Sequence, residues 1–323
     1  MENQKGRTMK KNFFNKIMIL FFITLLTLSE TTPYTAYTKA STSINSKNKN
    51  TSSPDDNSDN DTDITGDNSE DNTKDTTSDK KGIIIQIGKS QKTVEPLEGS
   101  FLKKNGIKYF KKQNGKLAKN CFFRKGKSIY HVNSKGEVSL GWNKIKGHYY
   151  FFDRKSGKMA YNKKADRIKI TKTGIAKETN QNIEIIKVYL EAQKVVQKTS
   201  KPTNSKPEKL YKCYLWIAKF PYKRYRTMKS AKKNYPNNWD IVFANDIFKN
   251  HNGCCASEAC AFAYLAKACG YENVTICSDT GHAWVDIGGK LYDPLFAESR
   301  DFNANYNSNY TDYRKNPAYT KKL

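Results

Sequence analysis

Three residues near the C-terminus have the types and the order needed for thiol chemistry. Cys255, His282 and Asp293 lie within about forty residues of one another. A cysteine supplies a nucleophile, a histidine takes its proton, and a carboxylate holds the imidazole in one tautomer and orientation. We therefore predict a catalytic set of these three side chains, if the fold brings them together.

A helix is expected to carry the cysteine. Ala259, Phe262 and Ala266 recur at steps of three and four residues, and Gly270 is a suitable helix stop. The pattern predicts a helix over residues 255–269, with Cys255 at its N-terminus. The backbone N–H groups and the dipole at this end favour a negative sulfur, so a lowered pKa is expected for Cys255.

Two short strands are expected to carry the histidine and the aspartate. Residues 273–277 and 282–287 are predicted strands, and Gly288-Gly289 is a two-residue hairpin turn. That turn sets the register, so Ile287 should face Lys290.

The same register has a consequence for the site. It sets Val285 opposite Tyr292 and Trp284 opposite Asp293. Alternation then places His282, Trp284 and Asp293 on one face, with a diagonal His–Asp separation of about 7–8 Å between backbones. We expect the helix of Cys255 to pack on this face, which would let His282 serve both partners.

This stretch resembles the transglutaminase-like superfamily of papain-like fold. The resemblance covers about residues 213–297, and the matching positions are Gly253, Cys255, Ala259, Phe262, Leu265, Gly270, His282, Ala283, Trp284, Asp293 and Pro294. It implies Cys255 as nucleophile, His282 as base and Asp293 as orienting carboxylate, and Trp284 is predicted to contact substrate. Cys254 departs from the family pattern.

Two further helices are predicted before this domain. Apolar residues at helical spacing mark residues 183–197, and a second stripe marks residues 208–220, which Pro221 ends. Together with the strands they predict an α+β domain over residues 181–323.

A repeat precedes that domain, over residues 82–180. Gly115, Gly136 and Gly157 lie 21 residues apart, and aromatic residues keep the same interval. Each unit is interpreted as an aromatic-rich strand, a turn at the glycine and a second short strand. Such hairpins are unstable alone but can stack and bury an aromatic stripe between neighbours.

One unit, residues 141–160, resembles the cell-wall-binding repeat of the choline-binding type. It begins Gly141-Trp142 and contains the run His148-Tyr149-Tyr150-Phe151-Phe152. In that family, aromatic side chains of adjacent hairpins enclose the choline of teichoic acid by cation–π attraction. The resemblance implies ligand contacts by Trp142 and Tyr150, and lysine-rich hairpins would also hold anionic polymer by charge.

The N-terminus predicts export. Lysines and an arginine precede an apolar run over residues 17–28, which is too short to span a bilayer and fits an export signal. We predict a signal peptide over residues 1–40, with no stable membrane span after export. Residues 41–81 are rich in Asn, Asp, Ser and Thr and predict a disordered spacer.

The charge and the cysteine content of the chain limit which binding partners and bound groups are expected. The chain has 57 basic and 31 acidic residues, a net charge of +26, and residues 51–80 alone hold ten of the acidic ones. A basic surface attracts polyanions. Export makes anionic cell-wall polymer such as teichoic acid, or peptidoglycan, the expected partner, and argues against nucleic acid. The seven cysteines show no Cys-x-x-Cys spacing, so no metal and no cofactor is predicted.

The predicted function is that of a secreted, cell-wall-associated transglutaminase-like enzyme with a protein or peptide substrate. A thioester on Cys255 resolved by an amine crosslinks proteins, whereas water makes the enzyme a peptidase or amidase. The sequence leaves both open. The alternative is a catalytically inactive cell-wall-binding or adhesion protein, in which the three residues remain only as structure.

Overall fold

The computed structural model describes residues 82–310 and 316–323. The signal peptide predicted over residues 1–40 and the spacer predicted over residues 41–81 lie outside the described residues. Among helices of the described ranges, none combines the length and apolar character needed to cross a bilayer.

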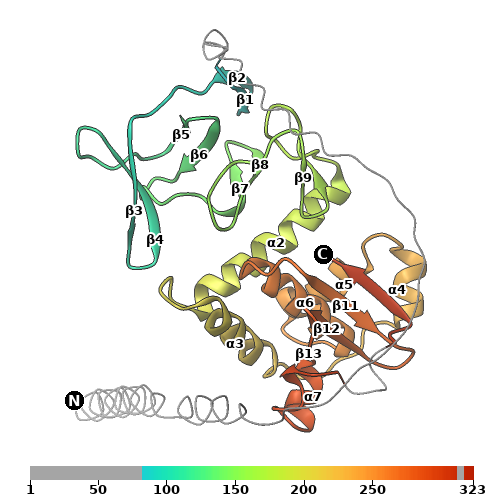
Figure 1. Cartoon of the computed structure of the whole chain (residues 1–323). Coiled ribbons are helices and arrows are strands. Elements are labelled where there is room, and N and C mark those ends of the chain that lie inside the picture. Colours follow the sequence, from blue (N-terminus) through green and yellow to red (C-terminus); the bar gives the residue numbers. More distant parts are fainter. Residues whose placement is uncertain (1–81, 311–315) are drawn as a thin grey trace, which may run out of the picture. The chain divides into compact units, whose positions relative to one another are not determined.

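The first described region is a series of two-stranded antiparallel hairpins, the hairpin array (Figure 1). Its strands are β1 (Ile84–Ile87), β2 (Ser90–Thr93), β3 (Gly99–Lys104), β4 (Ile107–Lys112), β5 (Cys121–Lys125), β6 (Ser128–Val132), β7 (Gly141–Ile145), β8 (His148–Phe152), β9 (Lys164–Ala165) and β10 (Ile168–Lys169). Each strand pairs with its neighbour in sequence, as the repeat predicts.

The predicted turns at Gly115, Gly136 and Gly157 are confirmed, because an antiparallel bridge closes each of them, whereas a further series of tight turns was not predicted. The tight turns between paired strands contain Gly106, Gly126 and Gly147, all at positive φ. Gly115, Gly136 and Gly157 form a second turn after each hairpin, followed by isolated bridges such as Lys111 to Leu117. Each unit therefore has two glycine turns, because both tight reversals need a left-handed residue.

Aromatic side chains fill the space between hairpins. Phe110 and Phe123 lie with ring centroids 4.4 Å apart, and Phe101 lies 4.8 Å from Tyr130. A neighbouring cluster contains Tyr150 and Phe152. These contacts stack the hairpins, because a two-stranded sheet alone buries too little apolar surface.

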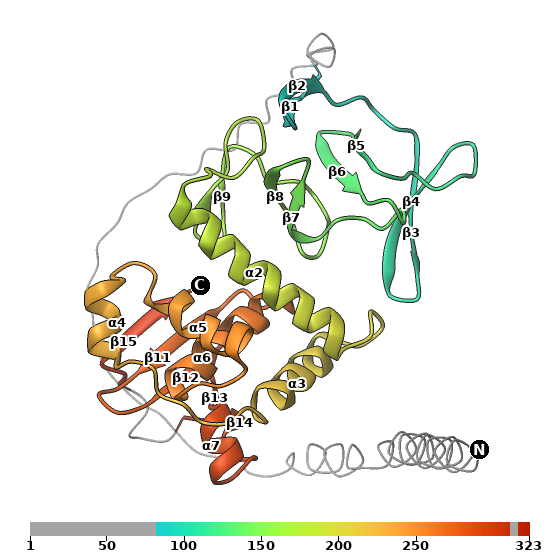
Figure 2. The same ribbon diagram turned by 180° about the vertical axis from the view of Figure 1, so that it is seen from behind.

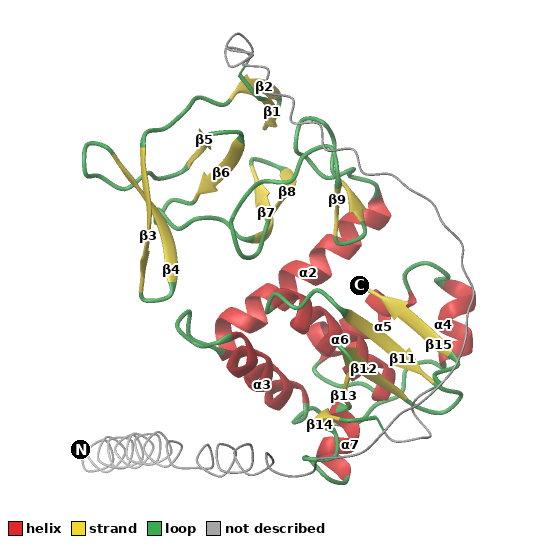
Figure 3. Cartoon of the chain, in the orientation of Figure 1, coloured by secondary structure: helices red, strands yellow, loops and turns green. Residues whose placement is uncertain are grey.

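Helices follow the array (Figure 3). They are α2 (Asn180–Thr199), α3 (Lys206–Ile217), α4 (Met228–Asn234), α5 (Trp239–Asn250), α6 (Cys255–Ala268) and α7 (Pro294–Ser299). The three predicted helices correspond to α2, α3 and α6 within a few residues. Ser205 and Glu208 form a capping box that begins α3 two residues before the predicted start.

One five-stranded antiparallel sheet completes the region, in the order β14-β13-β12-β11-β15. Its strands are β11 (Val274–Ser278), β12 (Ala283–Ile287), β13 (Lys290–Tyr292), β14 (Tyr306–Ser308) and β15 (Tyr319–Lys322). The predicted β12–β13 register is confirmed, with Ile287 opposite Lys290 and Val285 opposite Tyr292. The fold is thus a mixture of helices and sheet preceded by small hairpin sheets.

Helix α6 forms the centre of this region. It packs against α2, α3 and α5 and against strands β11 and β12 (Figures 1 and 2). Every residue from Cys255 to Lys267 is buried. A helix that is apolar on all sides belongs in a core, and this burial fixes the position of its first residue, Cys255.

Buried ion pairs join the last hairpin to the helices. Arg167, between β9 and β10, contacts the carboxylate of Asp240 in α5 at 2.8 Å, and Lys321 contacts the same carboxylate at 2.7 Å. Asp240 is fully buried. Burial by itself would raise the pKa of Asp240, but the two cations outweigh it and hold the pKa below its usual range.

Candidate functional site

Asp293 is a buried carboxylate with two fixed partners. It is fully buried and caps α7, where its Oδ1 accepts a hydrogen bond from the backbone N–H of Phe296 at 3.1 Å. Its Oδ2 lies 2.6 Å from Nε2 of His282. Pro294 follows at the first helical position, which requires no N–H donor. The cap therefore aims one carboxylate oxygen at the histidine.

His282 is held on several sides. Its backbone N–H donates to the Asp279 carboxylate at 2.5 Å, and its carbonyl accepts from the Ser278 hydroxyl at 2.9 Å. The ring stacks on Phe296 at 3.9 Å with an interplanar angle of 15°. Because Nε2 pairs with Asp293, Nδ1 is the ring atom left to exchange a proton with another group.

Cys255 is the first residue of α6 and is 7% exposed. Its sulfur accepts a hydrogen bond from the backbone N–H of Ala283, the residue after His282. The preceding loop is tight. A Cβ on Gly253 would lie 2.5 Å from Cβ of Ser257 and 2.9 Å from Cδ1 of Ile247. A glycine two residues before Cys255 is therefore required by packing.

The two adjacent thiols share a hydrogen bond, which the sequence did not predict. The Cys254 interaction and then burial raise the pKa of Cys255, whereas the Cys255 interaction and backbone N–H groups of α6 lower the pKa of Cys254. The expectation of a lowered pKa at Cys255 is wrong for this arrangement. The backbone N–H groups at the start of α6 favour a negative charge on the Cys254 sulfur, the cap residue, and its presence raises the pKa of Cys255.

Trp284 lies on the opposite face of the sheet from the expected one. Ala283 and Val285 belong to the core that contains α6, whereas Trp284 packs with Cys277 and Leu291 in a separate cluster. The expected face is therefore wrong for Trp284. His282 and Asp293 sit just beyond the ends of β12 and β13, so strand alternation does not fix their direction.

The other two residues predicted to contact ligand are also buried. Trp142 is fully buried, and its Nε1 donates to Asp166 at 2.8 Å. Tyr150 is fully buried and donates to the carbonyl of Gln86 at 2.5 Å. Trp284 is also 0% exposed. These three rings present no face to solvent, so no exposed surface supports their predicted ligand contacts, which stay predictions.

Glu258 is a feature that sequence reasoning missed. It is fully buried one turn into α6, and within the described residues neither carboxyl oxygen has a hydrogen-bond partner. Burial, with the nearby charges of Glu298 and Asp293, raises the pKa of Glu258 to about 9. Its helix position three residues after Cys255 was the signal, since every neighbouring position on α6 is apolar or small.

A second carboxylate, that of Asp246 in α5, stabilises the start of α6. Asp246 accepts two hydrogen bonds from Arg226, at 2.6 and 3.0 Å, and one from the Ser257 hydroxyl at 2.7 Å. Ser257 in turn contacts Cys254 at 3.7 Å. The chain of contacts fixes the loop in which both thiols lie.

The described residues contain no group of three or more His, Cys, Asp or Glu side chains arranged to hold a metal ion. Cys260 packs in the core of α6, as its sequence position predicts. The candidate site contains a thiol pair, an imidazole and a buried carboxylate, the residue types of a nucleophilic relay.

The chain was compared with known proteins. No protein-family model matches it, and no curated protein matches it. Solved structures do match over a part of the chain. One is choline binding protein F from Streptococcus pneumoniae, with 20% identity and a TM-score of 0.24 over 25% of this chain and 27% of that one.

Two further matches are domains from the same organism. The choline-binding domain of Spr1274 shares 26% identity, with a TM-score of 0.23 over 26% of this chain and 98% of that domain. The choline-binding domain of CbpL shares 21% identity, with a TM-score of 0.21 over 25% and 43%. This chain spans about a quarter of choline binding protein F.

These three structures are choline-binding proteins or domains by name, and their TM-scores of 0.21–0.24 carry no argument about this chain. The matched structures do not assign the chain to a family. The predicted transglutaminase-like resemblance and papain-like fold of the C-terminal region find no counterpart among them and stay predictions.

Proposed function

We propose that this chain is a cell-wall-binding protein whose hairpin array contacts an anionic envelope polymer. The observation that carries the proposal is the charge of the array. Residues 82–180 contain 24 lysines and arginines and six acidic residues. The stacked hairpins carry these side chains on both their strands and their turns, and a polyanion gains attraction from many of them at once.

Sedimentation of the full chain with purified cell-wall material tests this proposal. We expect retention at low salt that decreases as salt screens the charges. Wall material stripped of its anionic polymer should retain less protein. Equal retention by stripped and intact wall would contradict the proposal, and so would retention by DNA-coated beads that exceeds retention by wall.

A second candidate function is thiol-mediated acyl transfer or hydrolysis at Cys255. The contact that favours it is the 2.6 Å hydrogen bond between His282 Nε2 and the fully buried Asp293. Such a carboxylate fixes the tautomer in which Nδ1 can accept a proton, and it stabilises the imidazolium that forms. Sulfur at the start of α6 beside the Ala283 N–H is the group to be activated.

In the proposed reaction, Cys255 Sγ attacks an amide carbonyl while His282 Nδ1 takes the thiol proton. The tetrahedral intermediate collapses, the C–N bond breaks, and the histidine returns the proton to the leaving amine. A thioester remains on Cys255. Water then releases an acid, or a second amine forms a new amide, and the thiol regains its proton in either case.

The rival interpretation is a binding protein with an inactive site. It is favoured by the raised pKa and low exposure of Cys255, because a buried thiol that keeps its proton is a poor nucleophile. Under this interpretation the His282–Asp293 pair only stabilises the sheet edge and α7.

A product search separates the two. Envelope proteins and wall peptides are incubated with wild type, with Cys255→Ala, or with Cys121→Ala as a matched control in the array. Mass spectrometry then looks for new isopeptide bonds or cleaved amides. We expect products with wild type and Cys121→Ala and none with Cys255→Ala. Identical product lists for all three proteins would leave wall binding as the function.

A further inference from the structure

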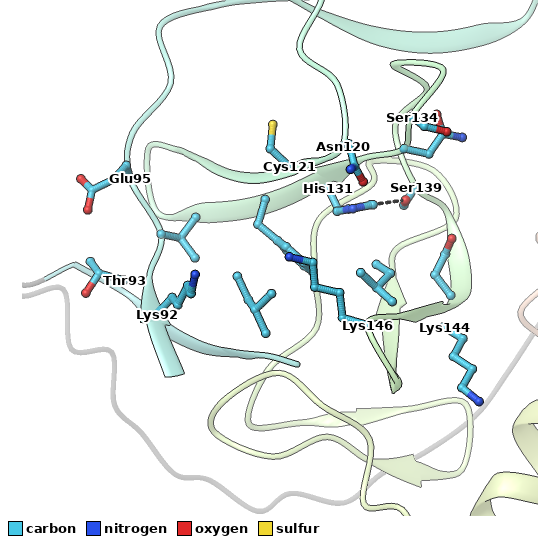
Figure 4. A pocket seen from close by; sticks show the side chains of 16 residues that line it. Lys92, Thr93, Glu95, Asn120, Cys121, His131, Ser134, Ser139, Lys144 and Lys146 are labelled. Carbon is cyan, nitrogen blue, oxygen red and sulfur yellow. Dashed lines mark hydrogen bonds between the residues drawn. The ribbon is translucent and has the colours of Figure 1, made fainter. Parts of the chain in front are cut away.

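A cavity of about 600 Å³ opens between three hairpins of the array (Figure 4). Its walls come from the β1–β2 hairpin, from β5 and β6, and from β7. That volume lies in the range of small-molecule sites and suits a ligand of one or two sugar units. We call it the array cavity.

The floor of the array cavity is apolar, and amides surround it. Ile87, Phe122 and Ile145 are partly buried side chains that line it, and they pack against the neighbouring hydrophobic cluster. Asn120, Asn133 and Asn143 also line it. Asn133 is engaged by Glu137 and two backbone N–H groups, and Asn143 Nδ2 by two backbone carbonyls. Asn120 and the Asn143 Oδ1 are therefore the amide groups offered to a ligand. An aromatic ring with amides beside it suits a hydroxylated carbon skeleton, whose C–H groups and hydroxyls need both kinds of contact.

The aromatic groups of the cavity do not form a cage for a cation. The rings that line it are Phe122 and His131, 4.7 Å apart and tilted by 52°. His131 is buried and bonds the Ser139 hydroxyl at 2.8 Å, and burial lowers its pKa to about 4, so its ring is neutral. Tyr150 lies behind Phe122 at 5.3 Å and is fully buried. One phenyl face is a weak site for a quaternary ammonium.

The charges of the cavity favour an anion. Lys92, Lys144 and Lys146 line it, and Glu95 is the acidic residue among the lining side chains. Figure 4 shows the amino groups of Lys92 and Lys146 directed toward the middle of the cavity, whereas Lys144 and Glu95 extend away from it. A choline cation would meet two like charges there, and an anionic group would meet two opposite ones.

We propose that the array cavity binds a sugar or polyol carrying an anionic group, held by Lys92 and Lys146 above the Phe122 ring, and that it does not bind choline. This proposal names a ligand class for the proposed wall-binding function and rests on that function. A phosphate and a carboxylate would both satisfy the two ammonium groups, so the shared chemistry is an anion on a hydroxylated skeleton.

Isothermal titration calorimetry on the full chain tests the proposal with four probes: glucose 6-phosphate, glucuronate, glucose and choline. We expect heat with an anionic sugar at millimolar concentrations or below, at least about tenfold weaker binding of glucose, and no binding of choline. Binding of the phosphate probe alone, or of the carboxylate probe alone, identifies which anion the cavity takes. Binding of choline with an affinity equal to that of the anionic sugars would overturn the proposal.

A matched pair of variants separates a site from general charge. Lys92→Gln/Lys146→Gln removes the two cavity lysines, and Lys116→Gln/Lys158→Gln removes two exposed lysines of the array that do not line the cavity. The first should weaken the anionic sugar at least about tenfold, and the second less than twofold. Equal affinities in both double variants would overturn the proposal.

Wall sedimentation with the same variants keeps the two proposals distinct. If intact wall retains wild type and both double variants equally, wall binding stands and the cavity assignment fails. If wall retains none of them while calorimetry shows the cavity-specific loss, the cavity assignment stands and wall binding fails.

Discussion

The hairpin array and the helix-and-sheet region of this protein are built in opposite ways. In the array each strand pairs with its sequence neighbour, and charge is spread over exposed turns, giving a net +18 over residues 82–180. After residue 180 the net charge is +9 over 143 residues. There β11 pairs with β15, about forty residues away, and several charges are buried as ion pairs.

The difference bears on what each region can do. Local pairings repeat one shape and offer many equivalent contacts, which suits a repetitive polymer. Non-local pairings bring His282 and Asp293 together and fix their geometry, which suits chemistry. The two regions should therefore respond differently to substitution.

The largest expected effect concerns the orienting carboxylate. Asp293→Asn keeps the cap of α7 but removes the charge that steadies the imidazolium, so acyl chemistry should fall by about 10³- to 10⁴-fold. Wall sedimentation should remain at the wild-type level, because the array is untouched. A variant with full activity would show that the His282–Asp293 pair has only a structural role.

The next largest expected effect is the loss of stability when a buried charge is removed. Asp240→Asn leaves Arg167 and Lys321 without their anion and should cost about 3–5 kcal/mol in the free energy of unfolding. Glu184→Gln, which breaks an exposed pair with Lys187, is the control and should cost less than about 0.5 kcal/mol. Urea denaturation measures both, and equal costs would contradict the buried network.

Glu258 gives a pH-dependent prediction. Its pKa is raised to about 9 in the folded protein, so the folded state keeps a proton that the unfolded chain loses above its ordinary pKa. The stability contributed by the protonated Glu258 carboxyl is complete at acid pH and is lost as the pH rises through about 9. Glu258→Gln should therefore be more stable than wild type by roughly 2–4 kcal/mol at pH 8, with little difference at pH 4. Parallel stability curves across this range would argue against a buried, neutral carboxyl.

The smallest effect compares one glycine from each region. Gly126 and Gly270 both have positive φ, and a Cβ at either would meet no atom within 4 Å. Alanine at each should cost about 1–2 kcal/mol from backbone strain alone. Calorimetric scans should show Gly126→Ala lowering the transition of the array and Gly270→Ala that of the helical region. One common shift for both variants would show that the regions unfold together.

The sequence predicted the elements with strong local signals. Helical spacing located α6, and the Gly288-Gly289 turn gave the register of β12 and β13. The helix α5 was missed because Asp240 and Asp246 interrupt its apolar pattern, and both are buried through partners distant in sequence. The turns at Gly115, Gly136 and Gly157 were predicted, whereas the series at Gly106, Gly126 and Gly147 was missed because both glycine series have nearly the same spacing.

The same limit applies to the candidate site. Order and spacing were enough to predict that His282 and Asp293 approach each other. The proton shared by Cys254 and Cys255, and the side of the sheet that Trp284 occupies, depend on packing around α6 and could not be read from local pattern.

The second candidate function depends on activation of the Cys255 sulfur by His282. The rate at which iodoacetamide alkylates each cysteine at pH 7, measured by peptide mass spectrometry in wild type and His282→Ala, tests it most directly. If His282 takes the proton of the Cys255 thiol, the alkylation rate of Cys255 should fall about tenfold or more after the substitution. Alkylation of Cys254 in place of Cys255, or an unchanged rate in His282→Ala, would contradict it.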